Sequence, residues 1–281
     1  MTAKIFDGHL VAKHIKNKIL SIVKKRVKLG KLIPGLATIL VGNNPASIIY
    51  IKHKREVCQE VGFFSLYYNL PNSVSTLELV TIIKKLNKNK KIHGILIQLP
   101  LPSNIKFSIL QHINHKKDVD GFHPYNIGRL CQNNPILSPC TPLAVITLLK
   151  YYNINVSGLH AVIINSSNIV GRPMFFELLN IGCTVTVINK HTNNLKYYVN
   201  HADLLIVAIG KPNFIPGSWI KLGAIIIDIG INKLNGKLVG DIDYKNSLNR
   251  ASYITPVPGG IGPITVAILM KNTLQAATLL D

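Results

Sequence analysis

Apolar residues along the chain follow two spacings, one typical of helices and one typical of buried strands. Near the start they recur every three or four positions between lysines, at Val11, Ile15, Ile19, Ile22, Val23 and Val27. This spacing predicts an amphipathic helix over residues 10–27 that ends near Gly30. The compact run GLATILVG, residues 35–42, then predicts a strand.

A second helix is predicted from NPASIIYIKHKREVCQEV, because Asn44 suits the N-cap and Pro45 suits the first turn. Its apolar stripe comprises Tyr50, Val57, Cys58 and Val61. Lys54 falls on the same stripe, since residues three and four positions apart share one face of a helix. An ammonium group in such surroundings needs an explanation.

The pattern continues with a strand at residues 63–70, a helix through Leu86 that begins with a capping box of Ser75 and Glu78, and a strand at residues 93–102. Strands that alternate with helices are joined by crossovers and therefore lie parallel. We expect an α/β domain over residues 1–139, with ligands near the C-terminal ends of its strands.

A helix at residues 141–152 leads into a second α/β domain, expected over residues 140–262. Four short apolar runs of the kind found in buried parallel sheets predict its strands, at residues 161–165, 183–189, 203–210 and 224–231. A last helix follows the second domain. We expect this helix, within residues 263–281, to pack back on the first domain.

Composition excludes several classes of protein. The 281 residues are 47% hydrophobic, enough for a substantial core, yet no run of about 18 uncharged apolar residues suggests a membrane span. We expect a soluble, cytoplasmic protein without an export signal or membrane anchor. Cys58, Cys131, Cys140 and Cys183 are scattered, and the histidines show no metal-binding spacing, so reduced thiols and no metal site are expected.

The net charge of +20 raises the alternative of a nucleic-acid-binding protein. However, the lysines are spread along the chain, and the abundance of isoleucine and asparagine points to a compositional bias toward AT-rich codons. Aromatic residues make up only 7% and do not cluster with the basic residues, as they do in single-strand binding proteins. We therefore expect neither nucleic acid nor a membrane as a partner.

One turn suggests a dinucleotide. The strand AVII leads into NSSNIVGRPM, residues 165–174, and then an apolar helix, which is the context of a phosphate-binding turn. A G-x-G-x-x-G motif is absent, so ordinary strand–turn–helix architecture remains an alternative. Lys190 ends the next strand, where NAD enzymes commonly place an acid. A cation there favours the 2′-phosphate of NADP, unless Lys190 is simply a solvated lysine.

Several segments together resemble one enzyme family. In order, they are YIKHK, GILIQLPLP, KDVDGFHPYNIGRL, PCTP, SNIVGRPM, ADLLIVAIGKP, GAIIIDIGIN, GDIDY and ITPVPGGIGPITVA. Over essentially its whole length, the chain resembles bifunctional methylenetetrahydrofolate dehydrogenase/methenyltetrahydrofolate cyclohydrolases. The resemblance implies NADP-dependent oxidation of 5,10-methylenetetrahydrofolate, then hydrolysis to 10-formyltetrahydrofolate. It also implies a homodimer, a folate cleft between two α/β domains of which the second is a Rossmann-like NADP-binding domain, and no metal.

The resemblance assigns catalytic roles to Lys54, Gln98 and Asp120. Burial disfavours the charged form of a lysine, so Lys54 is expected to receive or relay the proton of the attacking water. Gln98 is expected to hydrogen-bond Lys54 or that water, because a buried amide needs a partner. Asp120 is expected to accept hydrogen bonds from the pterin, whereas the neighbouring Asp118 is expected to be structural.

Substrate contacts are expected from two places. Tyr50 offers aromatic area for the flat rings of the folate, one turn before Lys54, and Ser47 lies near it. A glycine-rich loop contributes Pro258, Gly259 and Gly260, whose backbone can approach the substrate closely.

The resemblance also implies a set of cofactor contacts: Asn165, Ser166, Ser167, Gly171, Arg172, Lys190, Gly210, Ile231 and Thr265. The family usually has glycine at the position of Asn165 and often arginine or alanine at that of Ser166. Asparagine tolerates a left-handed backbone, so the turn is expected to survive. Because the Asn165 side chain crowds the path of the pyrophosphate, weaker cofactor binding is expected. A dehydrogenase with a weakened cyclohydrolase, or one that prefers NAD, remains an alternative.

Overall fold

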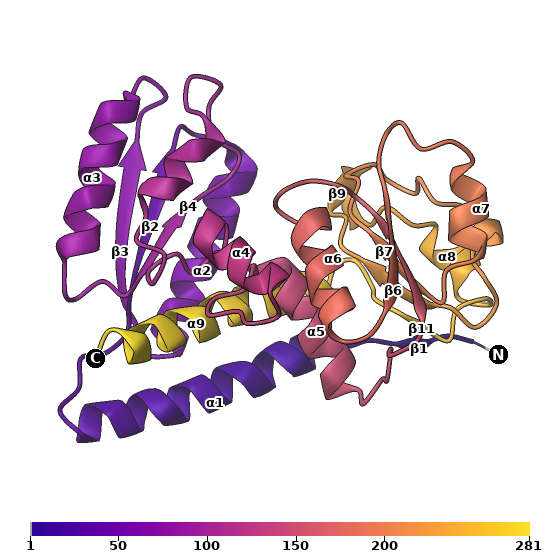
Figure 1. Ribbon diagram of the computed structural model, residues 1–281, viewed down its shortest axis with the longest axis horizontal. Coiled ribbons are helices and arrows are strands. Elements are labelled where there is room, and N and C mark those ends of the chain that lie inside the picture. The colour runs from indigo at the N-terminus through magenta and orange to yellow at the C-terminus, as the bar shows by residue number, and fades with distance from the viewer. Residues whose placement is uncertain (1) are drawn as a thin grey trace. The chain divides into compact units, whose positions relative to one another are not determined.

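The computed structural model describes residues 2–281, which form two compact units with parallel sheets (Figure 1). The first unit contains residues 13–140 and 266–281. The second contains residues 141–265 together with residues 2–12. This confirms the predicted α/β class. The N-terminal residues had been expected in the first domain, but they lie in the second unit because β1 (Lys4–Ile5) pairs with β11 (Tyr253–Ile254).

The sheet of the first unit has three strands in the order β3-β2-β4. These are β2 (Gly35–Val41), β3 (Phe64–Leu70) and β4 (Gly94–Ile97), and every pairing is parallel. All seven residues of the central strand β2 are buried, which explains why its sequence is a continuous apolar run instead of an alternating one. β4 is shorter than predicted because Pro100 and Pro102, which follow it, lack the N–H group that a ladder needs.

Three long helices precede or connect these strands: α1 (Gly8–Lys28), α2 (Pro45–Glu60) and α3 (Thr76–Lys88). The predicted caps are confirmed. The Asn44 side chain accepts the N–H of Ser47 at 3.1 Å at the start of α2. Ser75 and Glu78 form a reciprocal capping box at the start of α3.

The predicted stripe of α1 is wrong at its C-terminal end. Val11, Ile19 and Val23 are buried as expected, but Val27 is 54% exposed and Arg26 is buried in its place. Positions 26 and 27 both continue the stripe from Val23, so helical spacing does not distinguish them. The Arg26 guanidinium pairs with the Asp281 carboxylate at 2.8 Å, and this ion pair selects Arg26 for the interior.

The first unit is completed by η1 (Phe107–His112), α4 (Pro124–Cys131) and residues 266–281, most of which belong to α9 (Ile261–Leu279). A buried amide connects α9 to this unit. Asn272 Nδ2 donates to the carbonyl groups of Val119 and Ser138, both at 2.9 Å. These bonds hold the segment that ends in Asp120 and the residues before α5 (Cys140–Tyr151) against the same helix face.

The second unit contains a parallel sheet of six strands in the order β1-β11-β8-β7-β5-β6. Its other strands are β5 (His160–Ile164), β6 (Thr184–Ile188), β7 (Leu204–Val207) and β8 (Ile225–Asp228). The predicted strands at these four places are confirmed. The chain runs from β5 outward to β6 and then returns to β7 on the other side of β5. The sheet therefore has its topological switch point between β5 and β7, where α/β proteins bind ligands.

Helices α6 (Gly171–Asn180), α7 (Leu195–Asn200), α8 (Tyr244–Ser247) and the turn η2 (Gly217–Trp219) complete the second unit. The two-residue strands β1 and β11 were not predicted, because they are too short to show a period. A hairpin of β9 (Asn232–Leu234) and β10 (Lys237–Val239) was not predicted either. Asn235 and Gly236 form its turn with φ of 49° and 80°, the usual Asn-Gly signature of a two-residue hairpin.

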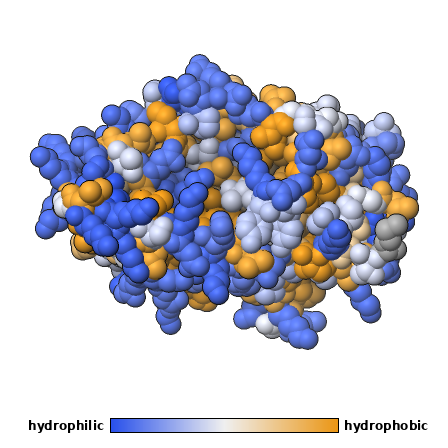
Figure 2. Space-filling view, turned by 90° about the horizontal axis from the view of Figure 1, so that it is seen from below, coloured by the Kyte–Doolittle hydropathy of each residue, from blue (hydrophilic) through white to orange (hydrophobic). Residues whose placement is uncertain are grey.

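Among the lysines and arginines of the described residues, Arg26 and Lys117 are buried and the others are at least partly exposed at the surface. Figure 2 shows one face of the molecule, on which hydrophilic side chains cover most of the area and hydrophobic residues form smaller areas between them. Within the part of the chain that the structure describes, no helix has the length and apolar character needed to cross a bilayer.

Candidate functional site

Lys54 and Gln98 meet in the first unit. Lys54 lies on α2 and is half-buried, and its Nζ atom donates to Oε1 of Gln98 at 2.9 Å, which confirms the expected hydrogen bond. Gln98 follows β4 directly. Its backbone N–H donates to the carbonyl of Ile39 and its side-chain amide donates to that of Leu99, both at 2.8 Å. The side-chain Oε1 atom of Gln98 is thus held where it accepts the hydrogen bond from Lys54.

Asp120 adds a carboxylate to this pair. Burial raises the pKa of Asp120 from 3.8 to about 6, and the neighbouring Lys54 cation acts in the opposite direction. Asp118, two residues earlier, is 2% exposed and accepts hydrogen bonds from the His123 N–H and the Asn126 amide. Asp118 therefore anchors the local backbone, as expected, whereas Asp120 is close enough to Lys54 to feel its charge and shares a hydrogen bond with the Cys140 thiol.

The N-terminal turns of α2 place the other two predicted residues. Ser47 is buried, and its N–H is used by the Asn44 cap. Tyr50 is 39% exposed, one turn before Lys54, and burial of its hydroxyl raises the pKa of Tyr50 above the ordinary value. Further along the helix, Val57 is buried. Ile51, between Ser47 and Lys54, is also buried, so the buried face of α2 continues on both sides of Lys54 and Tyr50 lies at its edge.

The glycine-rich loop belongs to the second unit, whereas Lys54 belongs to the first. Gly259 has φ of +102°, which disfavours any other residue. Its carbonyl accepts the N–H of Gly8 at 2.8 Å. A Cβ atom at Gly8 would lie 1.8 Å from the carbonyl oxygen of Gly260, so the loop packs against the start of α1 without room for a side chain.

The predicted phosphate-binding turn follows β5, and its hydrogen bonds differ from the expectation. Asn165 is not among the asparagines with positive φ, so its left-handed tolerance is not used. Its Oδ1 atom accepts hydrogen bonds from the Ser167 N–H at 2.8 Å, the Ser167 hydroxyl at 2.7 Å and the Gly171 N–H at 2.9 Å. A Cβ atom at Gly171 would lie 2.0 Å from the Asn165 carbonyl oxygen, so helix α6 and the turn approach as closely as only glycine allows.

A pair of buried aspartates, missed from the sequence, organises the loop after β7. The Asp241 carboxylate accepts N–H groups of three consecutive residues, Ile209, Gly210 and Lys211. Asp228 in turn accepts the N–H groups of Gly230, Asp241 and Ile242. In the sequence, the acidic segment GDIDY, which follows the hairpin and contains Asp241, was the signal that could have predicted this pair.

The charge of this pair is costly to bury. Burial raises the pKa of Asp228 from 3.8 to about 7, and the nearby charge of Asp241 adds to the rise. The backbone N–H groups of Asp241 and Ile242 act in the opposite direction, because they stabilise the ionised carboxylate.

The remaining predicted cofactor residues lie in the same unit. Lys190 is exposed, just past β6, and Arg172 is exposed on the first turn of α6, where its Nε atom donates to the Ser166 carbonyl at 3.3 Å. Ile231 is 45% exposed next to β9, and Thr265 bonds back to the Ile261 carbonyl within α9. Cations and hydroxyl groups on the loops after β5 and β6 suit a polyanionic dinucleotide.

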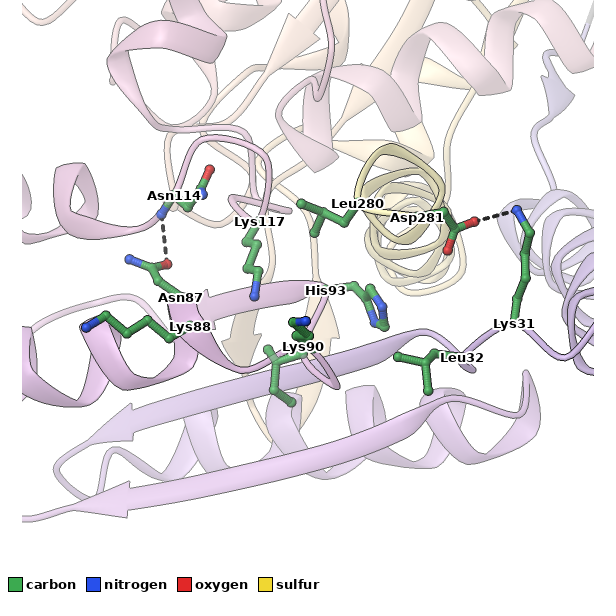
Figure 3. A pocket seen from close by; sticks show the side chains of 11 residues that line it. Lys31, Leu32, Asn87, Lys88, Lys90, His93, Asn114, Lys117, Leu280 and Asp281 are labelled. Carbon is green, nitrogen blue, oxygen red and sulfur yellow. Dashed lines mark hydrogen bonds and ion pairs between the residues drawn. The ribbon is translucent and has the colours of Figure 1, made fainter.

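A cavity of about 560 Å³ lies elsewhere in the first unit (Figure 3). Its lining is basic, but the buried Lys117 donates to the carbonyl groups of Leu86 and Asn89, near the C-terminal end of α3. Lys31 there pairs with Asp281 at 2.9 Å. These cations thus have structural partners, and none of the residues around the cavity belongs to the predicted site.

Within residues 2–281, no group of three or more histidine, cysteine, aspartate or glutamate side chains lies close enough together to hold a metal ion.

Two family models match the chain. The catalytic domain of tetrahydrofolate dehydrogenase/cyclohydrolase matches residues 6–120, and the NAD(P)-binding domain of the same family matches residues 139–280. Among solved structures, the bifunctional enzyme FolD from Campylobacter jejuni is 45% identical, with a TM-score of 0.96 and 99% of each chain covered.

Two further relatives differ in their cofactors. The Trypanosoma brucei enzyme, solved with NADP and an inhibitor, is 36% identical with a TM-score of 0.95, over 99% of this chain and 98% of that one. The Saccharomyces cerevisiae NAD-dependent 5,10-methylenetetrahydrofolate dehydrogenase is 22% identical with a TM-score of 0.82, over 98% and 97%, and shows only a shared fold. By the two matched domains and the full-length similarity, the chain belongs to the tetrahydrofolate dehydrogenase/cyclohydrolase family.

Proposed function

We propose that this methylenetetrahydrofolate dehydrogenase/cyclohydrolase uses NADP as its oxidant and carries out its hydrolytic step with Lys54, Gln98 and Asp120. The one-carbon bridge of 5,10-methylenetetrahydrofolate gives up a hydride and becomes the 5,10-methenyl cation. Water then adds to the methenyl carbon, and the ring opens to 10-formyltetrahydrofolate. This product is the formyl donor for purine and formyl-methionine synthesis.

The observation that carries the hydrolytic role is the contact between Lys54 and Gln98 beside Asp120. Water that attacks a carbon must lose a proton, and a positioned amine can receive it. The bond to Gln98 uses one N–H of Lys54, so the other positions on its Nζ atom are left for the attacking water. Gln98 fixes the amine because its own position is held by β4 and Leu99.

Asp120 and Tyr50 are proposed to hold the folate. An ionised carboxylate accepts hydrogen bonds only, which matches the amino and ring N–H donors of a pterin. The exposed part of the Tyr50 ring offers flat apolar area one turn from Lys54. Ser47 and the loop of Pro258, Gly259 and Gly260 are proposed to complete the substrate contacts.

The second unit is proposed to hold NADP at the switch point between β5 and β7. When bound there, the nicotinamide accepts the hydride, a step that needs neither an acid nor a base from the protein. The 165–171 turn and Arg172 are suited to the pyrophosphate, and the Lys190 ammonium is suited to a 2′-phosphate. Gly210, Ile231 and Thr265 are proposed to contact the rest of the dinucleotide.

One assay tests these proposals. Purified protein is mixed with 5,10-methylenetetrahydrofolate and either NADP or NAD, and methenyl formation and decay are followed by absorbance. Formation with NADP followed by enzyme-dependent decay supports both proposed activities. Faster methenyl formation with NAD than with NADP favours an NAD-preferring enzyme. Methenyl formation without decay above the uncatalysed rate favours a dehydrogenase that lacks the hydrolytic activity. The unusual residues Asn165 and Ser166 motivate these alternatives.

A homodimer in the cytoplasm is also proposed, as the family resemblance implies. In the described part of the chain, β3 forms one edge of the first unit's sheet, and its Phe64 is 40% exposed, so the strand can pair with a second copy. Light scattering coupled to gel filtration tests the proposed homodimer. A mass near 31 kDa, that of one chain, would contradict the dimer, whereas twice that mass is expected.

A further inference from the structure

The Asn165 side chain uses both of its polar ends. Its oxygen accepts three hydrogen bonds from Ser167 and Gly171, and its amide nitrogen donates to the carbonyl of Ala208. The side chain therefore points into the protein beneath the turn, whereas the sequence had suggested that it would crowd the cofactor path. Asn165 is half-buried, and Ser167 is exposed above it.

These bonds join the two strands that flank the switch point. Asn165 directly follows β5, and Ala208 directly follows β7. The loop beyond Ala208 is held separately, because Asp241 accepts the N–H groups of residues 209–211. The two loops at the expected dinucleotide position are thus fixed to each other by one side chain.

We propose that Asn165 is a positioning residue for the dinucleotide, which holds the 165–171 turn in its binding conformation before the cofactor arrives. The inference rests on the proposed function of the second unit as the NADP site. A loop that is ordered in advance loses less conformational entropy when a ligand binds, and affinity increases accordingly. The Ser167 hydroxyl and the first turn of α6 are oriented as a consequence.

The hydrogen bonds at position 165 require an amide side chain. Only a side chain with a donor and an acceptor on one short stem can serve the Ala208 carbonyl and the Ser167 and Gly171 N–H groups together. Alanine at position 165 would leave the Gly171 N–H, at the start of α6, without this acceptor. We therefore expect the turn to become mobile in such a variant while the sheet beneath it stays folded.

The test compares Asn165→Ala with Asn200→Ala, a matched change at an exposed asparagine at the end of α7 in the same unit. Calorimetric titration with NADP is expected to give a Kd about tenfold higher for Asn165→Ala and an unchanged Kd for Asn200→Ala. In the cofactor-free protein, the Ser167 and Gly171 amides should exchange hydrogen faster only in the first variant. Hydrolysis of methenyltetrahydrofolate without NADP should stay at the wild-type rate in Asn200→Ala.

An unchanged or lower Kd for Asn165→Ala overturns the inference, because the side chain then competes with the cofactor or plays no part in the turn. If the wild-type protein hydrolyses methenyltetrahydrofolate but does not bind NADP, the proposed cofactor is wrong. The inference about Asn165 is then wrong as well. If Asn165→Ala fails to fold, Asn165→Ser provides the same comparison, since serine is too short to reach the Ala208 carbonyl from this position. The same rise in Kd is expected for Asn165→Ser.

Discussion

The ammonium group of Lys54 donates a hydrogen bond of 2.9 Å to the side-chain oxygen of Gln98, which joins helix α2 to the residue that follows strand β4. Separate local contacts position the segments that carry these two residues. α2 begins at the Asn44 cap, and Gln98 is held by the Ile39 carbonyl. The contact is therefore a property of the packed unit.

Replacement of Lys54 by methionine should impair hydrolysis far more than oxidation. Methionine keeps much of the length and apolar character of the lysine stem but cannot accept a proton. General acid–base catalysis contributes about 100- to 10,000-fold, so we expect cyclohydrolase activity to fall at least about 100-fold. Methylenetetrahydrofolate oxidation, measured by absorbance in the same protein, should change by less than about tenfold, since hydride transfer needs no base.

Lys52→Met is the matched control for this experiment, because Lys52 is an exposed lysine on the same helix. Its two activities should equal those of the wild type. Equal rates of hydrolysis in Lys54→Met and Lys52→Met would show that position 54 has no part in proton transfer.

Asp120 should make folate binding sensitive to pH. Burial raises the pKa of Asp120 to about 6, so the carboxylate gains a proton as the pH falls through that value. A protonated acid is a poorer acceptor for pterin N–H donors, and the KM for the folate should therefore rise below about pH 6. Steady-state kinetics from pH 5 to 8 measure this. In Asp120→Asn the KM should be higher throughout and lose this pH dependence, whereas the KM for NADP should be unaffected.

Asp228 should reduce stability as the pH rises. The unfolded chain loses this proton near pH 3.8, whereas the folded protein retains it until about pH 7. Between these values the folded state binds more protons, so the free energy of unfolding decreases with increasing pH, by on the order of 4 kcal/mol for this group. Trp219, the single tryptophan, lies in the second unit and reports its unfolding by fluorescence.

Asp228→Asn isolates this effect. Asparagine stays neutral, but its amide N–H groups oppose one of the backbone donors, so the variant should be less stable than the wild type at pH 5 by about 1–3 kcal/mol. The difference should shrink or reverse by pH 8.5. A gap in urea midpoint that is constant from pH 5 to 8.5 would contradict the raised pKa.

Lys190 should decide between the two nicotinamide cofactors. Removal of its charge in Lys190→Ser should raise the KM for NADP by about tenfold, the size expected for one charge-assisted phosphate contact, and leave the KM for NAD unchanged. Lys196→Ser, at an exposed lysine on α7, is the control for a general loss of positive charge. A similar rise in both variants would assign the effect to the overall field of the protein.

Local signals in the sequence were sufficient for many elements. The Asn44 cap, the Ser75–Glu78 capping box and the four apolar strands of the second unit are confirmed, because each depends on neighbours within a few residues or on burial of a whole strand. The Asn-Gly hairpin at Asn235 carried an equally local signal that was overlooked.

The predictions from sequence were wrong or incomplete where contacts between distant segments determine the structure. The choice of Arg26 over Val27 for the interior depends on Asp281, at the other end of the chain. β1 exists because β11 lies beside it, and no periodicity can be seen in two residues. The buried role of Asp241 depends on three N–H groups that precede it by about thirty positions.

By itself, the sequence determined the α/β class, the positions of the main strands and helices, and the residue types on which the proposed chemistry rests. These follow from periodicity, caps and residue types, which act over short distances. Of the two partners expected for Gln98, only the tertiary structure selected Lys54, and only the tertiary structure decided that the Asn165 side chain turns inward to Ser167, Gly171 and Ala208. The reason is that hydrogen bonds between distant segments depend on the packing of strands and helices, which no local pattern encodes.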